Sequence, residues 1–431
     1  MNRHLAPGSG EILSASEYEA DRIGFLTQGT TRHGDFWEFA PHIYVAAGPE
    51  LTREVFRRTG AQFSPSRGAF PLPRGVRRAL TPGTLLPESL NAARRCFRHS
   101  GTTEHTAMVA AESAALARDW PCGETEEVMP RLKRTFSRIG AGFCFGADAG
   151  ALTHAEAALA RTRDNIPAST LYLPRWVPTV TRLRMRRRIN ALAGRIGAVM
   201  ERRLAQGRAM GPDLLSAMVQ ASSDHGTPPG APIAYLLSTI LVASQEMPTR
   251  AGAWLLLNLA RHPQWAEHIA AEADALPLDG YRVDAGHVAR LRTADAFVRE
   301  TLRLYPPNWL TSRIVVQPTD LGGHRLVPGD RILVSPYLLH RDERHHDRAD
   351  TFAPERWLEV SSPGTTGAYL PFGAGPRLCP GASLASLELV LVLAMTARAH
   401  RLSCPEPRPY RLDTNGALTP AGLRLVFHPR G

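Results

Sequence analysis

The sequence predicts a mainly α-helical protein with a small β-sheet, folded as a single domain over residues 1–431. Three observations lead to this prediction. Long apolar segments repeat at helical spacing through the middle of the chain, and prolines mark several of their ends. Short alternating runs separated by glycine turns are confined to the first ~75 residues and to a stretch after residue 310. No internal repeat and no long polar linker divides the chain.

The composition is that of an ordinary globular protein with ample material for a core, since 43% of residues are hydrophobic and 21% are charged. The formal net charge of +11 has several explanations: solubility, an arginine-rich genome, an acidic protein partner, or nucleic acid. The five cysteines form no CxxC pair and no metal-ligand spacing, which indicates free thiols in a reducing cytosol. They are Cys96, Cys122, Cys144, Cys379 and Cys404.

The N-terminal residues contain no apolar segment typical of a signal peptide, so we expect neither a signal peptide nor a membrane anchor. The apolar run Ala231–Ala243 is interrupted by Ser238 and Thr239, and it is shorter than the roughly 20 residues that a spanning helix needs. We therefore expect a cytoplasmic protein with no membrane contact.

The helices are predicted from apolar residues at helical spacing and from their end signals. They cover about residues 85–120, 136–145, 186–203, 214–221, 233–261 and 294–305. Pro174 and Pro178 precede the third of these helices, and Pro212-Asp213 precedes the fourth. His262-Pro263 and Pro306-Pro307 end the last two, because proline lacks the N–H that would continue the helix.

The strands are predicted from alternation between turn residues. Residues 43–46 form a strand near the N-terminus, and residues 313–316, 324–327 and 331–334 form three more. Gly322-Gly323 and Pro328-Gly329 supply the turns between the last three. A stretch of low regularity, residues 340–366, then leads into a loop rich in glycine and proline.

This loop, residues 372–381 with the sequence FGAGPRLCPG, carries the most informative residues of the chain. Glycines such as Gly373 let the backbone approach a flat ligand closely, and Phe372 can shield one side of the Cys379 sulfur. Arg377 offers a cation two residues before the cysteine. An apolar helix should begin directly afterwards, so its dipole and its N–H groups would stabilise a thiolate. These features describe a thiolate presented to a haem iron.

The loop resembles the cysteine-ligand loop of the cytochromes P450, and the resemblance extends from about residue 85 to the C-terminus, most clearly over residues 291–393. It implies the cytochrome P450 fold enclosing haem b, with Cys379 as the axial ligand of the iron. It also implies a monooxygenase, an oxidoreductase that activates dioxygen to oxidise a hydrophobic small molecule. The C-terminal segments are similar to those of bacterial enzymes that oxidise terpenoids, polyketides or other secondary metabolites.

Glu300 and Arg303 are spaced to share one helical face, and taken alone they are most simply a surface ion pair. They are followed, however, by Pro306-Pro307, by strands and by residues 352–357, FAPERW. This order resembles the ExxR motif of the family and its downstream arginine. The resemblance implies a buried structural cluster of Glu300, Arg303 and Arg356 that supports the cysteine loop.

The two haem propionates require cations. Arg377 is the best candidate by position, and Arg313 matches a propionate-binding arginine in many relatives. Arg95 falls where the family often has an arginine four residues after a histidine, but Asn91 replaces that histidine here. Arg95 is therefore either a propionate ligand or part of a solvated helix face.

Residues 243–247 align with the segment of the family that reads alanine or glycine, two variable residues, an acid and a threonine. The acid is present as Glu246, but Met247 replaces the threonine and Pro248 follows. Methionine has no O–H donor, and proline has no N–H. Glu246, Met247 and Thr249 are the candidate catalytic residues on this side of the haem.

Several reactions are compatible with Met247 in place of the family's threonine. Ordinary oxygenation, our leading hypothesis, would use Glu246 or Thr249 with water. A second hypothesis is that water or a hydroxyl of the substrate relays protons, and a third is that the enzyme uses peroxide. The remaining alternative is an atypical reaction such as oxidative coupling, desaturation or rearrangement.

Neither a dinucleotide fingerprint nor a Walker loop is present, so the resemblance implies external electron donors, a ferredoxin and a ferredoxin reductase. Ferredoxins are acidic, which would give the positive charge a use near the cysteine. The basic run at residues 182–188 fits a solvated helix start or an acidic partner. It fits nucleic acid less well, because no recognised nucleic-acid module accompanies it, so we expect no nucleic-acid partner. A non-enzymatic basic binding protein is the remaining rival class.

Two further segments take their meaning from the resemblance. His340-Arg341-Asp342 corresponds to a structural turn, and the histidines at 340, 345 and 346 lack zinc-site spacing. Residues 63–86 correspond to the loop over the substrate pocket, which Phe70, Leu72 and Leu85 could line.

Overall fold

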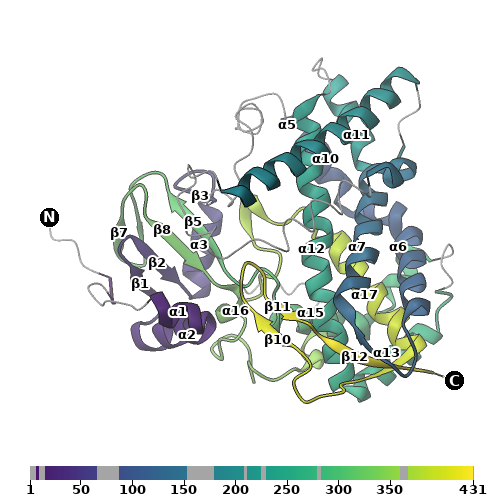
Figure 1. The fold of residues 1–431 in the computed structure, drawn as a ribbon. Coiled ribbons are helices and arrows are strands. Elements are labelled where there is room, and N and C mark those ends of the chain that lie inside the picture. Colours follow the sequence, from purple (N-terminus) through teal and green to yellow (C-terminus); the bar gives the residue numbers. More distant parts are fainter. Residues whose placement is uncertain are drawn as a thin grey trace.

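A computed structural model describes residues 6–8, 15–65, 87–152, 179–207, 211–224, 230–278, 283–359 and 367–430. Most of the molecule is helical, and a smaller part at one side contains the principal sheet with the N-terminal helices (Figure 1). The predicted class, mainly α with a small sheet, is confirmed.

The longer helices are α2 (Arg22–His33), α3 (Pro49–Arg57), α5 (Pro87–Cys96), α6 (His99–Asp119), α7 (Val128–Phe145), α10 (Val180–Ala205), α11 (Leu214–Asp224), α12 (Ala231–Arg261), α13 (Pro263–Asp274), α15 (Arg292–Leu304) and α17 (Ala382–Ala399). Shorter helical elements are α1 (Ala15–Ala20), α14 (Ala285–Ala289), α16 (Pro336–Leu339), η1 (Gly146–Leu152), η3 (Pro354–Trp357) and η5 (Gly375–Arg377). The strands are β1 (Phe36–Ala40), β2 (Ile43–Ala46), β3 (Phe63–Pro65), β4 (Thr125–Glu127), β5 (Thr311–Val315), β6 (Thr319–Leu321), β7 (His324–Leu326), β8 (Arg331–Val334), β9 (His400–Ser403), β10 (Arg411–Asp413), β11 (Thr419–Ala421) and β12 (Arg424–Pro429).

The principal sheet has the strand order β1-β2-β8-β5-β3, so it joins the N-terminal strands to those that follow residue 310. β2 and β8 are parallel, whereas β5 is antiparallel to β8 and places Arg313 opposite Ile332. The sheet buries its own small core, which includes Phe56, Phe63 and Val315. β5 lies between β3 and β8 in this sheet. Its Arg313 side chain lies over the Phe56 ring of α3.

α12 crosses the middle of the helical region (Figure 1) and is buried along most of its length. Residues 251–257 of this helix are all apolar and all buried, as expected of a core helix. Pro248 lies inside the helix, and two side chains just beyond it donate hydrogen bonds to nearby carbonyls. Thr249 Oγ1 donates to the oxygen of Gln245 at 2.5 Å, and Arg250 Nη1 donates to that of Glu246 at 2.9 Å.

α17 follows the cysteine loop and contains the most apolar helical segment of the described chain. Its 18 residues have a mean hydropathy of 1.6, so length and composition alone would let it cross a membrane. In the fold, however, 61% of that window is buried, because α17 packs against α6, α12 and α13. α17 is therefore a core helix, and it is the apolar helix that the sequence predicted directly after the cysteine loop.

The predicted helices and strands are present, but the structure also contains elements that were not predicted, including α13, β4 and the C-terminal strands β9 to β12. The segment predicted as one helix contains two, α5 and α6, because the helix is interrupted at Phe97 and Arg98. α2 and α3 were missed in a region expected to hold strands and turns. α2 has few apolar residues, and its start depends on the Asp21 side chain, which accepts a hydrogen bond from Gly24 N at 2.9 Å.

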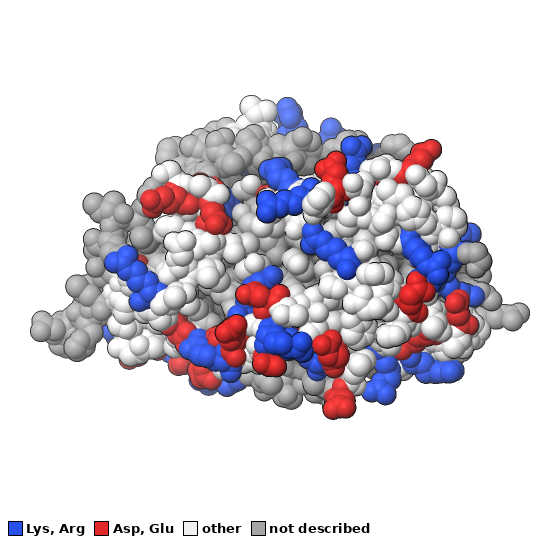
Figure 2. All heavy atoms as spheres, turned by 90° about the horizontal axis from the view of Figure 1, so that it is seen from below, with Lys and Arg blue, Asp and Glu red and all other residues white. Residues whose placement is uncertain are grey.

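The face seen from below in Figure 2 carries lysines and arginines interspersed with acidic residues. On this face the positive charge does not gather into one patch. The predicted lining residues Phe70, Leu72 and Leu85 and the start signals Pro174 and Pro178 lie outside the described residues.

Candidate functional site

A cavity of about 390 Å³ lies between α12, α17 and the cysteine loop. Its wall is largely apolar. α12 contributes residues three or four positions apart, which places them on one face of the helix: Ile240, Ala243, Ser244, Met247, Pro248 and Ala251. Phe372, Cys379 and Gly381 come from the loop, and Leu384, Ala385 and Glu388 come from α17.

The loop is held in shape by its own backbone. Cys379 N donates to the oxygen of Phe372 at 2.9 Å, and Gly373 N donates to that of Leu370 at 3.1 Å. Gly375 has a φ of +68°, and a Cβ there would lie 2.6 Å from the carbonyl oxygen of Phe56 in α3. Only glycine fits at this position, so the loop is docked on α3 by close backbone contact.

The Cys379 sulfur is open to the cavity, just before α17 begins at Ala382. Burial among the surrounding atoms raises the pKa of its thiol, and a hydrogen bond from the backbone of Gly381 partly opposes this. The protein alone therefore favours the thiol. A positive centre in the cavity would favour the thiolate, as a bound metal ion does.

Arg313 is a buried cation, 7% exposed, whose hydrogen bonds go to neutral groups. It donates to Thr59 Oγ1 at 3.2 Å, to Thr311 Oγ1 at 3.2 Å and to the oxygen of Ser312 at 3.0 Å. Within the described ranges no carboxylate pairs with it. Burial and the nearby charge of Arg377 lower its pKa. The guanidinium groups of Arg313 and Arg377 lie near each other, and such a pair suits the acidic groups of a bound ligand.

Glu300 and Arg303 form a fully buried pair on α15, with Arg303 Nε 2.9 Å from Glu300 Oε2 and Nη2 2.8 Å from Oε1. Glu300 also accepts hydrogen bonds from Ala353 N at 2.8 Å, Trp357 Nε1 at 2.8 Å and Arg356 Nε at 3.2 Å. Burial alone would raise the pKa of Glu300, but these donors and the charge of Arg303 lower it. The structure thus brings Glu300, Arg303 and Arg356 together.

The rest of the Arg303 guanidinium binds backbone carbonyls of a distant segment. Nη1 donates to the oxygens of His340 at 2.7 Å and Ala349 at 2.5 Å, and Nη2 donates to that of Thr351 at 3.0 Å. Neither these acceptors nor the Trp357 indole was predicted from the sequence. Trp357 had a usable signal, since it directly follows Arg356 and carries an N–H donor.

His340 connects this cluster to the cysteine loop. Its Nε2 accepts a hydrogen bond from Leu370 N at 2.8 Å, so Nδ1 carries the proton and donates to the oxygen of Arg303 at 3.0 Å. Burial lowers the pKa of His340 to about 3, which keeps the ring neutral. Leu370 in turn accepts the hydrogen bond of Gly373, so the chain of contacts runs from α15 into the loop.

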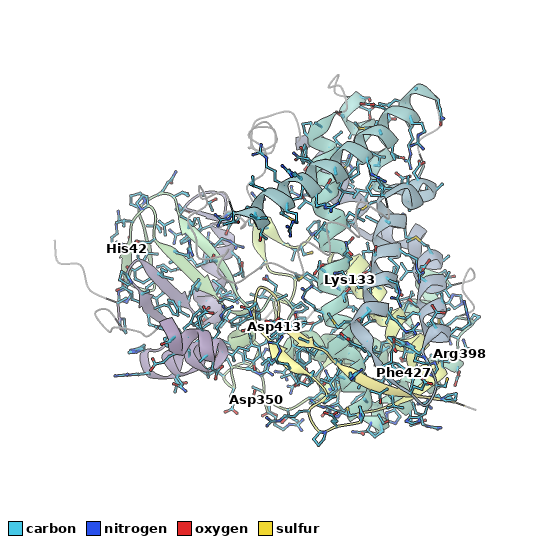
Figure 3. All side chains as sticks on the ribbon, in the orientation of Figure 1. His42, Lys133, Asp350, Arg398, Asp413 and Phe427 are labelled. Atoms are coloured by element: carbon cyan, nitrogen blue, oxygen red, sulfur yellow. The ribbon has the colours of Figure 1, made fainter. Side chains whose placement is uncertain are left out.

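The three candidate residues of α12 do not meet at the cavity. Met247 lies in the wall and is 39% exposed. Glu246 lies outside it, where it pairs with Arg250 and with Lys133, whose Nζ is 3.5 Å from Glu246 Oε1. Lys133 belongs to α7 (Figure 3). Thr249 is buried and also outside the wall.

Arg95 is exposed on α5 and does not line the cavity. Phe97, two residues later, does line it and packs near Gly381. Sequence reasoning had placed neither Phe97 nor Glu388 at the site.

Comparisons with known proteins agree with this geometry. The family model described as Cytochrome P450 matches residues 151–426. Cyclooctatin synthase of Streptomyces melanosporofaciens is 30% identical, over 99% of this chain and 96% of its own. Cyclooctat-9-en-7-ol 5-monooxygenase of the same organism is 27% identical, over 92% and 89%. The structure of retinoic acid bound cyanobacterial CYP120A1 shares the fold, with a TM-score of 0.80 and 18% identity over 96% of each chain.

Glu300→Gln is expected to lower the free energy of unfolding by about 3–5 kcal/mol, because it leaves the buried Arg303 without its counter-charge. Urea unfolding followed by circular dichroism measures the change. Asp320→Asn, which removes an exposed ion pair with Arg325, is the control and should cost less than about 1 kcal/mol. Equal losses in the two variants would contradict a special role for the buried pair.

The neutral His340 makes stability depend on pH. Its folded pKa of about 3 lies below the ordinary value of 6.5, so below pH 6.5 the unfolded chain binds the proton more readily. The contribution of the neutral ring to the free energy of unfolding is complete above pH 6.5. It is lost as the pH falls toward 3, by up to about 1.4 kcal/mol per pH unit. Urea unfolding of His340→Gln across this range should show a smaller slope than wild type, while His268→Gln, an exposed control, should not. An unchanged slope in His340→Gln would refute the assignment.

Proposed function

The chain belongs to the cytochrome P450 family, and from this premise we propose that it is a haem-thiolate monooxygenase whose iron is bound by Cys379. The observation that carries the proposal is the Cys379 sulfur, which opens into an apolar cavity at the start of α17. No other cysteine of the described chain lines that cavity. We also propose that residues 1–431 form one domain that works in the cytoplasm.

The residues around the cavity fit haem b. Cys379 supplies the axial thiolate, and the positive iron offsets the burial that raises the thiol pKa. Arg313 and Arg377 are the cations for the propionates, because Arg313 is buried without a carboxylate among the described residues. Phe372 shields the sulfur, and Gly373 gives the loop its turn at a φ of +75°. Arg95, exposed on the neighbouring α5, is the further propionate candidate.

When bound, haem supplies reductive activation of dioxygen, and the protein determines what enters the cavity and how protons reach it. Ile240, Ala243 and Leu302 provide an apolar wall that binds a hydrophobic substrate and excludes bulk water. Glu246, Met247 and Thr249 remain the predicted residues of the oxygen side. Of these three, Met247 faces the cavity, while Glu246 is held by Arg250 and Lys133.

We propose a terpenoid secondary metabolite as the substrate. Two relatives that match almost the whole chain carry the names cyclooctatin synthase and cyclooctat-9-en-7-ol 5-monooxygenase. A wall made largely of aliphatic side chains, with Asn308 and Ser244 as its few neutral polar members, suits a hydrocarbon skeleton that bears few oxygen atoms.

The electron donor we propose is an acidic ferredoxin, itself reduced by a ferredoxin reductase. Leu378, next to the iron ligand, is 55% exposed. Arg57 lies beside the loop on α3, and Arg95 and Arg98 lie at the end of α5. Exposed arginines on these two helices, together with an exposed apolar side chain of the cysteine loop, suit an acidic protein.

Cys379→Ser tests the iron ligand. The reduced, carbon-monoxide-bound wild type should show the red-shifted Soret band typical of the family, and Cys379→Ser should lose it because an alcohol does not replace the thiolate. Cys404→Ser, a half-buried cysteine away from the cavity, is the control and should keep the band. A Cys379→Ser protein that retained the band would end the proposal.

The docking proposal predicts a dependence on salt. The rate of reduction by an acidic ferredoxin should fall steeply between low and high ionic strength, since screening weakens attraction between exposed charges. Arg98→Glu should lower the rate constant for association about tenfold at low salt and have little effect at high salt. Stopped-flow reduction measures both, with Arg325→Glu, in the β6–β7 hairpin, as the control. A rate independent of salt would contradict this donor class.

A further inference from the structure

The surface of α10 carries a row of positive charge that no part of the proposed function uses. The arginine row consists of four residues, four or seven positions apart: Arg184, Arg188, Arg195 and Arg202. At these spacings side chains share one face of a helix, and all four are exposed. The buried residues of α10, such as Leu192 and Ile196, occupy a different face.

Little of this charge is neutralised within the protein. Among the described residues, a single ion pair involves the arginine row, and it joins Arg202 Nη1 to Asp148 Oδ1 at 3.9 Å. Glu201 is the one carboxylate of α10. Ala191 and Ala198 occupy the exposed positions between the last three arginines. Like charges on one helical face repel each other, so the row destabilises the free protein and calls for a functional explanation.

α10 holds the arginine row in a fixed position. The helix packs against α12 and η1, and Asn190 Oδ1 accepts a hydrogen bond from the Tyr235 hydroxyl of α12 at 2.8 Å. Near its C-terminal end, Arg203 pairs with Asp148 at 2.7 Å and with Asp213 at 2.9 Å. Because the helix is anchored at these points, a ligand of the row need not order it on binding.

The spacing of the arginines indicates the shape of the ligand. At the helical rise of about 1.5 Å per residue, the row from Arg184 to Arg202 is about 27 Å long. Its last three members, from Arg188 onward, follow one another at about 10.5 Å. A second helix with a carboxylate at every seventh residue repeats at the same interval, so its charges stay in register along the row.

The composition of the same surface favours a protein over a membrane or nucleic acid. A helix that lies in a membrane surface needs large apolar side chains along its length. On α10 the exposed ones near the row, Val180 and Leu183, lie at one end, where they suit an apolar contact with a protein. The phosphates of a DNA strand follow each other at about 3.4 Å, far closer than these arginines.

We propose that the arginine row of α10 is a docking surface for an acidic partner protein other than the electron donor, and that this partner presents a helix with carboxylates seven residues apart. The inference goes beyond the proposed function. The cysteine loop, where electrons enter, is docked on α3, whereas α10 packs against α12 and η1 (Figure 1).

The principal test uses two synthetic peptides of about 25 residues, alanine-rich so that they form helices. One carries glutamate at every seventh position, and the other has the same composition with its glutamates on all sides. Fluorescence anisotropy with the haem-loaded protein at low ionic strength measures the Kd of each. The first peptide should bind at least about tenfold more tightly, and this preference should shrink at high salt. Equal Kd values would overturn the proposal.

Charge reversal identifies the surface that binds the peptide. Arg188→Glu combined with Arg195→Glu should raise the Kd of the first peptide at least about tenfold. The control combines Arg186→Glu with Arg325→Glu, which changes the net charge equally. Arg186 is exposed on α10 about half a turn away from the row, so this control should change the Kd less than about twofold. Equal effects of the two double variants would reduce the binding to general attraction and refute the docking surface. Circular dichroism and Tm should match wild type in both.

The other occupants are tested on the same proteins. If duplex DNA or phosphatidylglycerol vesicles bind through Arg188 and Arg195 while the first peptide does not, the partner is not an acidic protein and the proposal fails. Reduction by an acidic ferredoxin should be equally fast in wild type and in the Arg188→Glu, Arg195→Glu variant. A slower rate would assign the row to the electron donor and contradict a second partner. A wild type without the thiolate Soret band would end the proposed function, whereas the peptide measurements decide the docking surface by themselves.

Discussion

The buried ion pair of Glu300 and Arg303 is the constraint on which the rest of the site depends. Both side chains are fully buried, so each charge must be satisfied inside the protein. Arg303 binds the carbonyls of His340, Ala349 and Thr351, and Glu300 binds Ala353 N and Trp357. One pair on α15 thereby fixes the path of a long irregular segment that has few regular hydrogen bonds of its own.

That constraint reaches the cysteine through neutral groups. His340 donates to α15 and accepts from Leu370, and Leu370 accepts from Gly373 at the start of the loop. A buried ion pair is weak evidence of net stabilisation, because apolar residues of the same volume often do as well. Its clearest effect here is positional: it sets where residues 340–373 lie, and so where the Cys379 sulfur meets the cavity.

The sequence predicted those parts of the site that depend on local spacing. Glu300 and Arg303 lie on one turn of helix, and Cys379 lies in a short loop before an apolar helix, so both could be recognised from neighbouring residues. The partners of Glu246 could not be foreseen in this way. Lys133 is far from it in sequence and reaches it only because α7 packs against α12. α2 was missed because it has few apolar residues. α3 carried a usable signal, since Pro49 lies in its first turn and Thr52, Val55 and Phe56 share one buried face.

Two ionisable groups line the described cavity wall, one in the loop before α17 and one within α17, and their surroundings act on them in opposite ways. Cys379 precedes the first turn of α17, where backbone N–H groups and a bound metal favour the charged sulfur. Glu388 lies further along, where apolar packing against α6, α12 and α13 favours the uncharged acid. The position of both therefore follows from the contacts that anchor the cysteine loop to α15.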